Sequence, residues 1–142
     1  MGESEKHRSS VARIVDWLQA HPDLDPDVPL RIDSTEFPTA SSPPSIGGYV
    51  PDVFFENSRN SLTVLGEAKT ARDLETDRSR KQLQAFLEYL AVCPQALFIL
   101  AVPWSVVNYA KQFLLSVRDH EGPAALTIVV LSELDARYVA NQ

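Results

Sequence analysis

Two carboxylates and a lysine are spaced so that one β-hairpin would bring them together. The sequence contains Pro51-Asp52 and, after fourteen intervening residues, Glu67-Ala68-Lys69. Glu67 and Lys69 are two residues apart, so in a strand their side chains project from the same face. Carboxylates are hard oxygen ligands that suit Mg²⁺ or Mn²⁺, and a neighbouring lysine can orient a water molecule. This combination predicts metal-assisted hydrolysis of a phosphodiester.

Whether Asp52 joins this set depends on the register of the hairpin. A four-residue turn at residues 57–60 would place Asp52 opposite Leu65, which shares a face with Glu67 and Lys69. Asp52 and Glu67 would then be diagonal neighbours, with Cα atoms roughly 7–8 Å apart. A slip of one residue would send Asp52 to the opposite face, so the predicted site depends on this register.

Hydrophobic periodicity and turn residues predict the elements that must position these side chains. In chain order they are a helix at 4–20, a short strand near 30–32, strands at 49–56 and 61–69, a helix at 73–92, a strand at 96–102, a helix capped by Ser105, a strand at 126–131 and a short helix at 133–139. Helix, three strands, then alternating helices and strands indicate an α/β fold with a mixed central sheet flanked by helices.

Length and composition indicate one globular domain, spanning residues 1–142. The chain is 44% hydrophobic and 23% charged, which is typical of soluble proteins. No apolar run approaches the ~20 residues of a membrane span, and the first residues lack the apolar segment of a secretory signal. Cys93 is the sole cysteine, which excludes an internal disulfide and a cysteine-based zinc site. We therefore expect a cytoplasmic protein.

The charge distribution bears on nucleic-acid binding. A net charge of −6 argues against a broad phosphate-binding surface, but binding depends on local charge. Basic residues follow Lys69 closely, at Arg72, Arg78, Arg80 and Lys81. They form either a phosphate-binding edge or a solvated helix face with alternating charges, and the sequence leaves both open. His7 is expected at the surface, and Trp104 in the core or an interface.

Pro51-Asp52 and Glu67-Ala68-Lys69 resemble the two motifs of the PD-(D/E)xK nuclease superfamily, which includes restriction endonucleases and Holliday-junction resolvases. The resemblance covers about residues 5–102 and implies a restriction-endonuclease-like αβββαβ core, with residues 103–142 as a C-terminal α/β extension. It further implies that Asp52, Glu67 and the backbone carbonyl of Ala68 ligate Mg²⁺ or Mn²⁺, while Lys69 assists the attacking water.

Two further residues are implied by the same resemblance. Members often place a glutamate of the first helix at the site, and Glu5 is the best match. Some members use a glutamine of the helix after the lysine. Gln82 is preferred over Gln84 for this role, because it shares a helical face with Tyr89. The distance between Gln82 and Tyr89 differs from the tighter spacing of exonuclease-type members, so an endonuclease is favoured.

The implied function is a metal-dependent nuclease acting on DNA, with RNA left open, in repair, recombination or defence. A chain this small has little area for base readout, so a homodimer or a partner subunit is expected to supply specificity. Two alternatives remain at this point. The chain could be a catalytically inactive relative serving as a binding or assembly module of a larger complex. It could also be an acidic protein-interaction domain in which the motif is coincidental.

Overall fold

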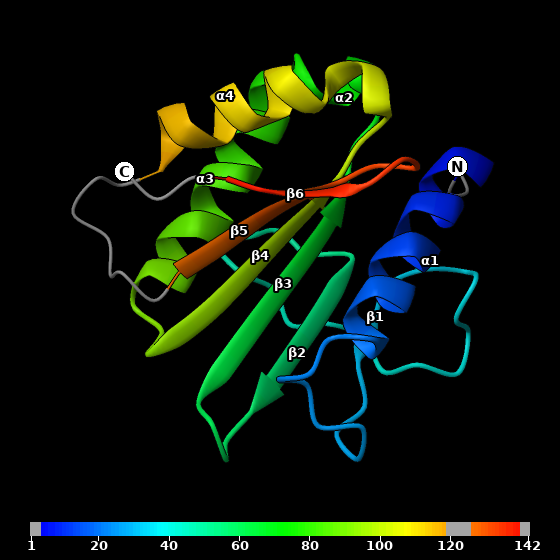
Figure 1. The fold of residues 1–142 in the computed structure, drawn as a ribbon, viewed down its shortest axis with the longest axis vertical. Helices are drawn as coiled ribbons and strands as arrows, with labels where there is room; N and C mark the ends of the chain where they lie inside the picture. The colour runs from blue at the N-terminus through cyan, green and yellow to red at the C-terminus, as the bar shows by residue number, and fades with distance from the viewer. Residues whose placement is uncertain (1–3, 119–125, 140–142) are drawn as a thin grey trace.

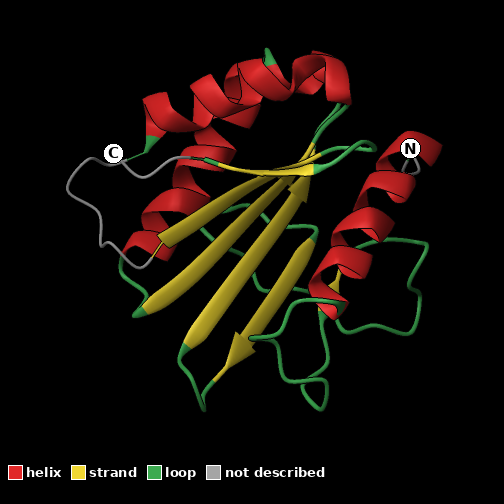
Figure 2. Ribbon diagram, in the orientation of Figure 1, coloured by secondary structure: helices red, strands yellow, loops and turns green. Residues whose placement is uncertain are grey.

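The computed structural model describes residues 4–118 and 126–139, which form an α/β fold around a six-stranded mixed sheet. The helices are α1 (Glu5–Gln19), α2 (Ala71–Leu74), α3 (Asp77–Ala91) and α4 (Val107–Val117), with a 3₁₀ turn, η1 (Trp104–Val106), before α4. The strands are β1 (Arg31–Ile32), β2 (Val53–Asn57), β3 (Leu62–Ala68), β4 (Gln95–Ala101), β5 (Leu126–Leu131) and β6 (Ala136–Tyr138). Figures 1 and 2 show the twisted sheet between its helices.

The strands lie in the sheet in their order along the chain. β2 is antiparallel to both of its neighbours, β1 and β3, whereas β3, β4 and β5 are parallel, and β6 returns antiparallel to β5. The parallel strands at the centre are apolar along their length, as expected for strands covered on both faces. This arrangement confirms the predicted mixed sheet.

Two hydrophobic cores cover the two faces of the sheet. α1 packs on one face through the helically spaced Val11, Ile14, Val15 and Leu18. α3 and α4 pack on the other face, against a larger core that contains Phe86. Phe54 and Leu65 belong to the core of this second face. Asp52 is two residues before Phe54 and Glu67 is two residues after Leu65, so their side chains project on the same face. No helix within the described ranges is long and apolar enough to cross a membrane.

The helix predicted at 73–92 is in fact two helices, and the prediction of one helix was wrong. Thr70 and Asp73 form a reciprocal capping box at the start of α2, with bonds of 3.1 and 3.4 Å. Thr76 then caps α3 by accepting from the backbone N–H of Ser79 at 3.1 Å. The first N–H groups of a helix have no carbonyl partner within the helix, and a threonine at the N-cap accepts one of them. Each threonine therefore marks the start of a separate helix. The first cap fixes the chain directly after Lys69.

The predicted hairpin register was wrong by two residues. The turn occupies residues 58–61, because Asn57 still pairs with Leu62 inside the ladder. The side chain of Asn57 accepts the N–H of Arg59 at 3.0 Å and so stabilises the tight turn. Val53 pairs with Gly66, which places Asp52 opposite residue 67 rather than opposite 65. A shift of two residues preserves the face, so the predicted side of the sheet holds for Asp52.

Two expectations in the C-terminal part were also wrong. Ser105 does not cap a helix, because it lies inside the 3₁₀ turn and α4 begins at Val107 without a side-chain cap. Residues 133–139 contain strand β6 rather than a helix. The hydroxyl of Ser132 accepts the N–H groups of Leu134 and Asp135 at 3.2 and 3.3 Å, which turns the chain back onto the edge of β5.

Gly66 offers a test of the packing between α1 and β3. A Cβ at this position would lie 2.9 Å from Cγ2 of Ile14 and 3.2 Å from Cβ of Val53. We expect Gly66→Ala to lower the free energy of unfolding by about 1–3 kcal/mol, measured by urea denaturation. In an Ile14→Ala background the same substitution should cost less, because the clashing methyl is gone. Equal costs in both backgrounds would contradict this packing.

Candidate active site

Asp52 and Glu67 are joined by a reciprocal pair of side-chain to backbone hydrogen bonds at the end of the β2–β3 hairpin. The backbone N–H of Asp52 donates to Oε1 of Glu67 at 3.0 Å. The backbone N–H of Ala68 donates to Oδ2 of Asp52 at 2.8 Å. Both residues are buried, with 7% and 4% of their surface exposed. Each carboxylate is therefore held by the strand that carries the other.

Lys69 and Gln82 complete a closed set of contacts around Glu67. The Lys69 ammonium lies 3.3 Å from Oε2 of Glu67 and donates to Oε1 of Gln82 at 2.5 Å. The amide of Gln82 donates to Oε2 of Glu67 at 2.7 Å. Gln82 is only 7% exposed and lies on the buried face of α3. The structure thus brings together Asp52, Glu67, Lys69 and Gln82, which are four side chains singled out in the sequence.

His7 is a site residue that sequence reasoning missed. Its Nε2 lies 3.1 Å from Oδ2 of Asp52, and its side chain is 25% exposed, so the expectation of a surface residue was wrong. Ser4 caps α1 by accepting the backbone N–H of His7 at 3.1 Å. His7 is four residues before Val11 and therefore continues the buried stripe of α1 toward its N-terminus. That phase is the signal by which it could have been found.

Glu5 lies apart from this cluster. It is exposed and lines a different pocket, together with Arg13, Pro103 and Glu133. Two positions separate Glu5 from His7, which turns the two side chains about 200° apart around the helix. α1 therefore contributes His7 rather than Glu5 to the contacts of Asp52.

The basic residues after Lys69 are dispersed. Arg72 lines a pocket together with Lys69. The guanidinium of Arg78 lies 5.3 Å from the ring centroid of Tyr49, and that of Arg80 lies 4.8 Å from the ring of Phe113. Lys81 is exposed on α3. Arg72 is thus the member of this set that shares a pocket with Lys69.

Two residues on the remainder of α3, Gln84 and Tyr89, have their contacts outside the site. Gln84 is exposed and its amide donates to Glu88 at 3.3 Å. Burial raises the pKa of the Tyr89 phenol, and the nearby Cys93 and Glu56 raise it further. Glu56 lies toward the turn end of β2, away from Asp52. The preference for Gln82 over Gln84 agrees with the contacts.

The cluster concentrates negative charge in a buried place. Burial raises the pKa of the Glu67 carboxyl well above its usual value, and the charge of Asp52 raises it further. Lys69 opposes this shift by its positive charge, and so does the N–H that Asp52 donates. The carboxylate pair is therefore short of positive charge, even with the lysine in place.

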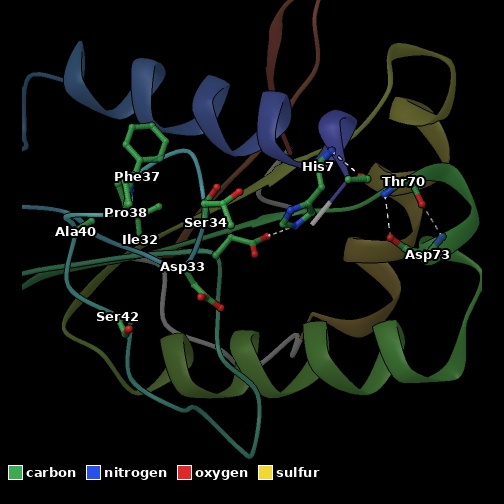
Figure 3. A pocket seen from close by; sticks show the side chains of 13 residues that line it. His7, Ile32, Asp33, Ser34, Phe37, Pro38, Ala40, Ser42, Thr70 and Asp73 are labelled. Atoms are coloured by element: carbon green, nitrogen blue, oxygen red, sulfur yellow. Dashed lines mark hydrogen bonds and ion pairs between the residues drawn. The ribbon is translucent and has the colours of Figure 1, made fainter. Parts of the chain in front are cut away.

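Two pockets of opposite character meet at the site, and His7 and Thr70 line both. The acidic pocket has a volume of about 760 Å³ and includes Asp33, Asp52 and Asp73. In Figure 3, Phe37 and Pro38 lie at one end of it, Thr70 and Asp73 lie at the other, and His7 points in between. The cationic pocket has a volume of about 390 Å³, and its basic residues are Lys6, Lys69 and Arg72.

The donor set fits a hard divalent cation. Asp52 and Glu67 supply two adjacent carboxylates whose charge is undercompensated. The N–H and C=O of a strand residue point to the same side, so the Ala68 carbonyl points to the β2 side of β3, as its N–H does. Among the described residues, no three His, Cys, Asp or Glu side chains form a metal-binding group. Two carboxylates and a carbonyl are nevertheless a suitable set for Mg²⁺, which commonly keeps several waters.

The chain matches no protein-family model, no curated protein sequence and no solved structure. The function is therefore argued from the geometry of the site.

The raised pKa of Glu67 predicts a pH-dependent stability. Between the ordinary value of 4.5 and the raised value, the folded chain holds a proton that the unfolded chain has lost. Folding therefore loses stability as the pH rises through this window. We expect the melting temperature in EDTA to fall across it, and to fall less for Glu67→Gln. Glu56→Gln, on the exposed side of β2, is the matched control for removing one carboxylate. Parallel curves for all three proteins would contradict the shift.

Proposed function

We propose that this chain is a Mg²⁺-dependent nuclease that hydrolyses phosphodiester bonds of DNA as an endonuclease. We further propose that it belongs with the PD-(D/E)xK superfamily and that β1–β4 with α1 and α3 correspond to its restriction-endonuclease-like core. The observation that carries the proposal is the reciprocal bonding of Asp52 and Glu67, with Lys69 and Gln82 in direct contact with Glu67. Cleavage in DNA repair, recombination or defence is consistent with this chemistry.

The proposed roles follow from the contacts. Asp52, Glu67 and the Ala68 carbonyl would hold the cation. The cation supplies charge neutralisation and a water of lowered pKa. Lys69 would then lie within reach of a water or a phosphate oxygen beside Glu67. Its ammonium can orient the water or stabilise negative charge on the phosphate. Gln82 positions both partners, because its amide group contacts Glu67 and Lys69 at once.

His7 adds a contact that orients Asp52. Its Nε2 lies 3.1 Å from Oδ2 of Asp52, the same oxygen that accepts the Ala68 N–H. A carboxylate with two such partners has little rotational freedom, which favours one fixed position for a ligand oxygen. We assign His7 as a positioning residue of the site.

The nuclease proposal predicts cleavage that depends on the cluster. Purified protein with Mn²⁺ should cut linear, circular or branched DNA, resolved on gels. Glu67→Ala should abolish cutting, and Lys69→Ala should reduce the rate about 10²–10⁴-fold, because transition-state charge loses its partner. Gln82→Ala should cost about 10- to 100-fold as a residue that orients the site.

Gln84→Ala is the matched control for Gln82→Ala, because it removes an exposed glutamine from the same helix. It should cut at the wild-type rate. Cutting by Glu67→Ala at the wild-type rate would point to a contaminating nuclease and sink the assignment.

A separate prediction concerns cation binding. Mg²⁺ or Mn²⁺ should raise the stability of the wild type and of Lys69→Ala, by about 2.7 kcal/mol at 100 times the dissociation constant. Asp52→Asn should lose this gain, because a ligand carboxylate is gone. Thermal unfolding against cation concentration measures it. Stabilisation without cleavage would favour the inactive binding module, and no stabilisation would favour the acidic protein-interaction domain.

A further inference from the structure

Trp104 is an exposed aromatic residue on the turn that borders the cationic pocket. It has 60% of its surface exposed, whereas tryptophan is on average largely buried. The residues on either side of it, Pro103 and Ser105, both line this pocket. Its backbone N–H donates to Oε1 of Glu133 at 2.5 Å, which anchors the turn that carries it. The indole is therefore exposed on a fixed turn whose two neighbouring residues line the pocket. Of the two expected locations, a core or an interface, the core is wrong.

The pocket beside Trp104 has the charge that a phosphate chain requires. Lys6, Lys69 and Arg72 line it together with the hydroxyl-bearing Ser10 and Ser105. None of the described residues that line it carries a carboxylate. In a chain with net charge −6, such a local excess of cations favours an anionic ligand here.

The opposite side of the site disfavours a second phosphate chain. Apart from Asp52, the acidic pocket contains Asp33 and Asp73, and Asp33 is exposed. A duplex carries two phosphate chains, so a duplex laid across the site would bring one of them against these carboxylates. A single strand has one phosphate chain, which the cationic pocket alone can accommodate.

Resting on the nuclease function proposed above, we infer that the substrate at this site is an unpaired nucleic-acid strand. Its phosphates lie in the cationic pocket, and one of its bases stacks on Trp104. Stacking on an aromatic side chain accepts any base, because every base has a π-face. An exposed indole on a turn that borders a cationic pocket suits the binding of a single strand.

Binding in EDTA tests this inference separately from cleavage. The probes are a fluorescently labelled 20-nucleotide oligo-dT and a labelled duplex of the same length, followed by anisotropy. Wild type should bind oligo-dT more tightly than duplex. Trp104→Ala should weaken oligo-dT binding about five- to 150-fold and leave duplex binding unchanged, whereas Trp104→Phe should retain part of the affinity.

Tyr138→Ala is the matched control, because Tyr138 is 59% exposed but lies on β6, outside the lining of either pocket. It should bind oligo-dT as the wild type does. Oligo-dT should also quench the indole fluorescence of the wild type but not that of Trp104→Phe, in which the half-buried Trp17 is the remaining tryptophan.

The phosphate contacts are tested by salt dependence. Lys6→Ala and Arg72→Ala should each reduce the slope of log affinity against log salt by about 0.7 for a single strand. Unchanged slopes for both variants would remove the phosphate chain from this pocket.

Three results would overturn the inference. The first is equal oligo-dT affinity for wild type and Trp104→Ala, and the second is a wild type that prefers duplex. The third is a Trp104→Ala variant that changes the mass of the protein in light scattering without changing DNA binding, which would assign Trp104 to a protein interface. Trp104-dependent binding of oligo-dT without any cleavage in Mn²⁺ would support the inference and overturn the nuclease proposal.

Discussion

The site depends on one structural constraint, which is the pair of hydrogen bonds that cross between Asp52 and Glu67. The ladder of β2 begins at Val53, and the amide of Asp52, directly before it, donates to the carboxylate of Glu67. The Ala68 amide does the same for Asp52. Because each carboxylate satisfies a backbone donor of the other strand, the positions of the two groups cannot vary independently. The register of the hairpin therefore sets the geometry of the chemistry.

This arrangement costs stability, and the cost is visible in the charges. Two carboxylates share a buried place, where burial and mutual repulsion raise the pKa of Glu67. Lys69 offsets part of the charge, and the amide of Gln82 adds a second donor to the same Glu67 oxygen. The two hydrophobic cores on either side of the sheet provide the stability against which such a cluster can be held. Buried carboxylates with a shifted pKa are typical of functional sites.

Short local caps determine how the remaining side chains reach the cluster. Ser4 begins α1 so that His7 falls at the end of its buried stripe, next to Asp52. Thr70 ends the extension of β3 directly after Lys69, and Thr76 begins α3 six residues before Gln82. Each cap is a single hydroxyl that satisfies a helix amide. Together the caps bring α1, the end of β3 and α3 to one end of the sheet, between the cationic and the acidic pocket.

The sequence alone determined the alternation of helices and strands and the face on which Glu67 and Lys69 project, because periodicity is a local property of the chain. Its helical pattern also distinguished Gln82 from Gln84 as the candidate glutamine. Only the tertiary structure decided the register opposite Asp52, the break between α2 and α3, and the return of β6 along β5. It alone brought His7 to Asp52 and left Trp104 exposed. The register, the return of β6 and the contact between His7 and Asp52 join residues far apart in the chain, and a local pattern does not identify such partners.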